Sequence, residues 1–104
     1  MPRADVLARI AGDFKRSAVE GVPGVCVREI TVDVWDRVVQ PALEQGGTAA
    51  GIALVIASAC DESGGMLFDV DDHEAVRALP VRVVNAIATA ASAINASEDD
   101  AAGN

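Results

Sequence analysis

The sequence predicts a mainly α-helical fold with a small N-terminal β-hairpin (an α+β fold), in which about four to five helices form a compact bundle. Three observations lead to this prediction. The 104 residues fall within the usual size of one domain. Half of them (51%) are hydrophobic, mostly Ala and Val, whereas 3% are aromatic. Apolar residues recur at helical spacing over most of the chain and alternate only in a short stretch after residue 15.

The first helix is expected at residues 2–14, because apolar side chains fall on one of its faces: Leu7, Ile10, Ala11 and Phe14. From Lys15 the period changes to two. Pro23 and Gly24 occupy the central positions of a type II turn, which predicts a hairpin with its second arm at residues 25–30.

The second helix is expected to start after Thr31, which can cap it, and to run to about Gln45. Two adjacent apolar rows are predicted on it, Val34–Val38–Ala42 and Trp35–Val39–Leu43. Pro41 removes one backbone donor, so the helix should kink or divide near Val38.

The third helix is predicted at residues 49–60, after the Gly46–Gly47 break, with Thr48 as its cap. Ser58 is its one polar side chain. A helix without a polar face must either be surrounded by other elements or offer apolar surface to another chain. Cys26 and Cys60 could approach one another if the hairpin covers this helix, and buried reduced thiols are the simplest role for them.

The remaining chain is expected to form a polar turn at residues 61–65 and a short apolar stretch at 66–68. Asp69 or Asp71 should cap a helix that starts near Asp72, and Pro80 should begin a second segment. A core stripe continues through both: Val76, Leu79, Val83, Ile87, Ala90 and Ile94. Residues 1–96 are thus expected to be one domain and 97–104 a disordered acidic tail.

The formal net charge of −8 is concentrated in two places. Residues 61–74 hold six acidic side chains and no Lys or Arg, and the tail holds three more. Such a charge disfavours binding to nucleic acids and to anionic membranes, both of which need clustered cations. The longest apolar run is about a dozen residues, whereas a bilayer span needs roughly 20. No membrane partner is expected.

No catalytic, metal or cofactor site is predicted, and we expect the protein not to be an enzyme. His73 is the single histidine, and no nucleophile motif stands beside it. The segment from Asp61 to Asp72 fails the EF-hand pattern, because Met66 stands where the loop needs Gly. Phosphate-cradling and dinucleotide-binding glycine patterns are also missing.

Short motifs in a particular order resemble the tail assembly chaperones of long-tailed bacteriophages and related gene transfer agents. Such proteins commonly read V-x-V-R-E-L-T near the start, D-x-x-G-x-x-L-F in mid-chain, and Leu/Ile-Asn at the end. This chain matches the first pattern at Arg28–Thr31, the second through Asp61, Gly64 or Gly65, Leu67 and Phe68, and the ending at Ile94–Asn95. The resemblance covers about residues 20–96. Pro23–Gly24 departs from it, because relatives often place Trp in the hairpin turn.

The resemblance implies a non-enzymatic protein of the bacterial host cytoplasm that is absent from the mature virion. It would bind the long tape measure protein, keep it soluble and help recruit tail tube subunits, and self-association is possible. A small acidic partner suits this role, because it can cover apolar stripes while its charge keeps the complex soluble.

Six residues are the candidates for partner binding: Trp35, Val39, Leu43, Ile52, Val55 and Ile56. A place in the core is the more common role for such side chains. Two other functions stay open on the sequence. A structural tail or head-tail completion protein would be present in purified particles, and a small acidic intracellular regulator would adjoin a toxin gene instead of a tape measure gene.

Overall fold

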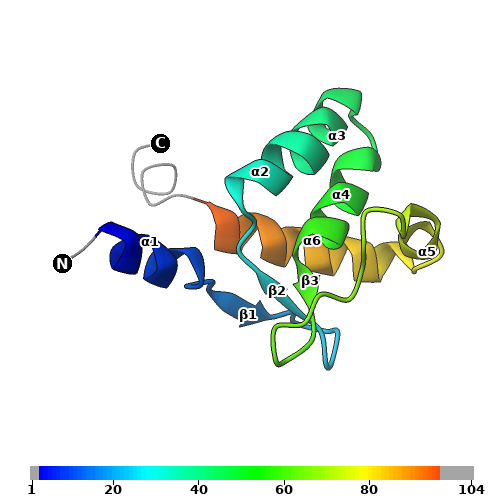
Figure 1. Ribbon diagram of the computed structural model, residues 1–104. Coiled ribbons are helices and arrows are strands. Elements are labelled where there is room, and N and C mark those ends of the chain that lie inside the picture. Colours follow the sequence, from blue (N-terminus) through cyan, green and yellow to red (C-terminus); the bar gives the residue numbers. More distant parts are fainter. Residues whose placement is uncertain (1–2, 97–104) are drawn as a thin grey trace.

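A small antiparallel sheet lies at one edge of a group of helices in the computed structural model, which describes residues 3–96 (Figure 1). The tail expected at 97–104 lies outside these residues. The elements follow in this order: α1 (Arg3–Ala11), β1 (Arg16–Ala18), β2 (Cys26–Arg28), α2 (Val32–Val34), the π-helical turn η1 (Trp35–Val39), α3 (Gln40–Gln45), α4 (Ala49–Ser58), β3 (Ala59–Cys60), α5 (His73–Arg77) and α6 (Val81–Asn95). The predicted mainly α-helical fold with an N-terminal hairpin is confirmed.

The predicted hairpin forms between β1 and β2, and a third strand joins it. The Val25 N–H donates to the Val22 carbonyl, and Gly24 between them has φ of 82°. On its other side β2 pairs with β3, so that Cys26 lies directly opposite Cys60. Both cysteines are free thiols.

The prediction that the third helix extends to Cys60 is wrong. The helix ends at Ser58, and Ala59 takes extended backbone angles. The reason is tertiary: the second edge of β2 carries backbone groups that need partners, and residues 59–60 supply them.

The segment α2–η1–α3 is one continuous helical stretch with a disturbed centre. Thr31 caps it as predicted, because its hydroxyl accepts a hydrogen bond from the Val34 N–H at 3.2 Å. The Gln40 N–H reaches back five residues to the Trp35 carbonyl, which widens the turn into a π-helix. The irregularity expected from Pro41 therefore takes the form of a π turn, and the helix still reaches Gln45.

Helix α4 is the centre of the core. It contacts α6, α3, η1 and α5, and most of its side chains are buried. Its one polar side chain, Ser58, is satisfied by donating to the Leu54 carbonyl. The absence of a polar face is thus explained by burial on nearly every side.

Helix α1 lies to one side of the body and contributes no buried residue (Figure 1). Leu7 is 46% exposed and Ile10 60% exposed, although they share the apolar face that the periodicity predicts. The helix also ends at Ala11, short of the predicted 14. Phe14 follows it and carries the Arg28 guanidinium 3.9 Å above its ring centroid.

Helices α5 and α6 form the two predicted closing segments, with Pro80 directly before α6. The expectation that Asp69 or Asp71 caps α5 is wrong. Asp72 stands at the cap position, but its carboxylate accepts from the Asp69 N–H, which tightens the preceding turn. The expected core stripe is most deeply buried at Val76 in α5 and at Ile87 in α6.

Asn95 connects the end of α6 to the segment that follows β2. Its side-chain oxygen accepts from the Ile30 N–H at 2.7 Å, and its amide donates to the Ala91 carbonyl. One side chain thus joins backbone segments 65 residues apart. The Ile-Asn ending therefore has a structural role.

Candidate partner-binding surface

A groove open to solvent lies between α4, α5 and the start of α6. Its volume is about 450 Å³, within the range of roughly 300–1,000 Å³ that protein ligand pockets occupy. We call it the α4–α6 groove. Its apolar walls come from Ile52, Leu54, Val76, Leu79, Val81 and Val84.

Small residues and one proline make this groove. Gly47, Thr48 and Gly51 line its α4 side and leave space that larger side chains would fill. A Cβ built on Gly51 would lie 3.7 Å from the Val84 Cγ1, an ordinary contact distance, so the space between the two helices here admits a methyl group. Pro80 starts α6 and thereby places Val81 at the groove, where it is 74% exposed.

The polar residues of the groove are few. Arg77 and Asn85 line it together with the apolar walls. Such a pattern, largely apolar with a small number of polar groups, is typical of sites that bury apolar surface and fix its orientation.

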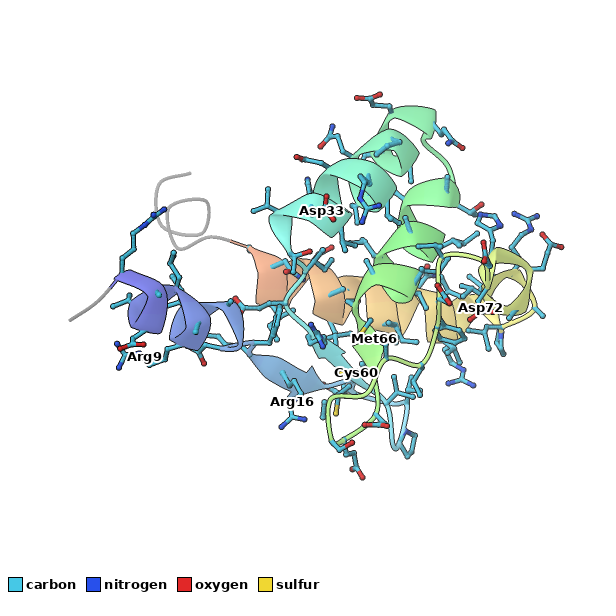
Figure 2. The ribbon with its side chains drawn as sticks, viewed as in Figure 1. Arg9, Arg16, Asp33, Cys60, Met66 and Asp72 are labelled. Atoms are coloured by element: carbon cyan, nitrogen blue, oxygen red, sulfur yellow. The ribbon has the colours of Figure 1, made fainter. Side chains whose placement is uncertain are left out.

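An acidic segment leads into the α5 wall of the groove. It carries Asp69, Asp71, Asp72 and Glu74, and no Lys or Arg within residues 3–96 forms an ion pair with any of them. The contact that Glu74 does make is with His73, at 3.9 Å. Figure 2 shows Asp72 beside α5, at the end of the molecule opposite Arg9. The groove therefore adjoins a segment of net negative charge, while the one charged residue in its lining, Arg77, is positive.

The turn at residues 61–65 carries further negative charge and is held by several hydrogen bonds. The Asp61 carboxylate accepts hydrogen bonds from the Ser63 hydroxyl, the Gly65 N–H and the Ser63 N–H. These bonds, the hydroxyl first, lower the pKa of Asp61 below its usual range. Met66 and Leu67, which follow the turn, are each 43% exposed.

The structure separates the six residues proposed from the sequence. Val39, Val55 and Ile56 are core residues, with Val39 and Val55 fully buried. Trp35 is half-buried and Leu43 is 44% exposed, but neither lines the groove. Ile52 does line it, at the floor, and is itself only 4% exposed. Four of the six are thus buried in this conformation, and Ile52 is the one of these four that lines the groove.

None of the six candidates lies on α5 or α6, so these two walls of the groove were not predicted from the sequence. The signal was present at Val81 and Val84, which are apolar but fall off the stripe that runs through Leu79, Val83 and Ile87. Apolar residues outside a core stripe at the start of a helix indicate a second apolar surface.

Within residues 3–96, no group of three or more His, Cys, Asp or Glu side chains could hold a metal ion. No helix in that range is both long and apolar enough to cross a bilayer.

Comparison with solved structures identifies a similar fold of known role. No family model and no curated protein matches the chain. The tail assembly chaperone of bacteriophage HK97 is similar to it, with a TM-score of 0.61 and 27% sequence identity. The match covers 90% of this chain and 99% of the chaperone. The resemblance to phage tail assembly chaperones is therefore confirmed, and it extends over nearly the whole fold.

Proposed function

We propose that this protein is a phage tail assembly chaperone that binds the tape measure protein, keeps it soluble and helps recruit tail tube subunits. The observation that carries the proposal is the likeness to the HK97 chaperone over 90% of this chain. The role is one of binding and not of catalysis. It would be carried out in the host cytoplasm, and the protein would be absent from the finished virion.

The surface of the molecule supports this role physically. A tape measure protein is a long, largely helical chain with apolar stripes, which aggregate unless they are covered. The α4–α6 groove offers apolar walls for such a stripe. The net charge of −8 would keep the complex soluble.

Co-expression with a tape measure protein from the same genome tests the proposal. We expect the soluble fraction of the tape measure protein to rise when the chaperone is present, and the two proteins to co-purify. Adding the tail tube protein should then yield a ternary complex. A tape measure protein that stays insoluble at equal expression would contradict the proposal.

The protein composition of purified particles distinguishes a chaperone from the main alternative, a structural protein of the particle. A chaperone is absent from them, whereas a structural tail or head-tail completion protein is retained in fixed stoichiometry. Mass spectrometry of purified virions makes this distinction, and a stoichiometric amount of this chain in the particle would favour the structural role.

A further inference from the structure

We infer that the α4–α6 groove seats the apolar face of an amphipathic helix from the partner, and that the acidic segment 69–74 selects a helix flanked by Lys or Arg. This inference rests on the proposed function, because it names the surface and the chemistry by which the chaperone would recognise its client. It concerns one occupant only, a basic amphipathic helix.

The form of the groove favours a helix. Its walls come from three helices and are mostly apolar. It is open to solvent, so side chains of another molecule can enter it. Helix-in-groove recognition uses two or three apolar anchors spaced at i, i+3 or i+4, and i+7. Val81 is the most exposed apolar residue of the lining, and a docked helix would cover it.

The charge beside the groove favours a basic partner. Asp69, Asp71 and Glu74 are exposed, and together with Asp72 they place four carboxylates directly before the α5 wall. Arg77 is the one charged residue in the lining and offsets a single negative charge. Lys or Arg beside the apolar face of the partner would therefore be attracted, and Glu or Asp would be repelled.

Two synthetic helical peptides of about 18 residues, or five turns, provide the probe. Both carry Leu at i, i+3, i+4 and i+7. One has Lys at the flanking positions and the other has Glu. Fluorescence anisotropy of the labelled peptides measures their affinity for the full chain. We expect the Lys peptide to bind at least tenfold more tightly than the Glu peptide, and its advantage to shrink as salt is raised.

Variants of the groove show where the peptide binds. Gly51→Leu should weaken binding of the Lys peptide at least tenfold by filling the groove, and Gly51→Ala should weaken it less. Val81→Ser removes an exposed apolar contact and should also weaken binding. Thermal unfolding of each variant checks that the fold is kept. If Gly51→Leu does not fold, Val81→Ser still tests whether the peptide binds in the groove.

Charge variants separate selection by the acidic segment from general attraction to an acidic protein. Asp71→Asn with Glu74→Gln should weaken binding of the Lys peptide by about threefold to tenfold, since exposed ion pairs contribute modestly. The matched control is Asp5→Asn with Asp13→Asn, which removes the same charge near α1, at the other end of the molecule from α5 (Figure 1). The control should leave the affinity unchanged.

Four results would overturn the inference. Equal affinity for the two peptides removes the selection by charge, and full binding by the groove variants places the site elsewhere. Concentration-dependent self-association that the groove variants abolish would make a second copy the occupant. If the groove variants still solubilise the tape measure protein in co-expression, the groove inference fails while the proposed function stands. If the wild type itself fails there, the proposed function fails, whatever the peptides show.

Discussion

Replacing Gly51 by Ala should stabilise the protein, although the residue lies in a contact region between two helices. Gly51 is the third residue of α4, and it is not among the glycines with positive φ. An added Cβ would lie 3.7 Å from the Val84 Cγ1, which is an ordinary van der Waals distance. The substitution therefore meets neither backbone strain nor a steric clash.

The expected gain follows from the conformational entropy of the unfolded chain. Ala in place of Gly within a helix stabilises it by about 0.5–1 kcal/mol. In a domain of this size, that corresponds to a rise in Tm of roughly 2–5 °C. The new methyl also occupies part of the α4–α6 groove, so the more stable variant should bind a groove ligand less well.

Gly24→Ala is the matched control. Nothing lies within 4 Å of a Cβ built on Gly24, but its φ is +82°. The same chemical change should therefore destabilise the fold, by about 1–2 kcal/mol, because the left-handed backbone disfavours a side chain. Thermal and urea unfolding of the two variants measure both values. A lower Tm for Gly51→Ala, or equal shifts of the same sign for both variants, would refute the reasoning.

Three further predictions concern stability. Asn95→Ala should destabilise the fold by about 1–3 kcal/mol in urea unfolding, because it orphans the Ile30 N–H, whereas Asn95→Asp keeps an acceptor and should cost less; equal losses would contradict this role. Asp61 has a lowered pKa in the folded state, so its ionised form stabilises the fold above the usual aspartate pKa of about 3.9, and this contribution is lost as the pH falls through the lowered pKa. The difference in Tm between the wild type and Asp61→Ala should therefore be full at neutral pH and shrink in acid, and a difference that grows in acid would reverse the sign. Val55→Ala, in the core, should cost about 2 kcal/mol by calorimetry, whereas Leu43→Ala, at 44% exposure, should cost less than about 1 kcal/mol; similar losses would place both residues in the core.

Local signals in the sequence located most helix boundaries and the hairpin. The Thr31 cap, the Pro23–Gly24 turn and the start of α6 after Pro80 all lie where the sequence predicts them. Pro41 likewise marked the irregular turn in the second helix. Each of these features depends on the backbone of a few neighbouring residues, so the sequence alone determines it.

The lining of the α4–α6 groove was predicted only in part. Of the six candidate residues, Ile52 on the unusually apolar helix lines the groove. Val55 and Ile56 on the same helix are buried in the core instead. A helix that is apolar on all sides has no periodicity that distinguishes its covered side from its open one.

What the sequence determined by itself was the fold class, the helices, the hairpin and the uneven charge. The tertiary structure decided which apolar surfaces are covered. Leu7 and Ile10 form a regular apolar face that remains exposed, whereas Ala59 and Cys60 leave the expected helix to pair with β2. Periodicity describes one element, but burial and strand pairing depend on what the rest of the chain places beside it. The groove exists because of such an arrangement, since Gly51 and Val84 come from two helices that meet only in the folded protein.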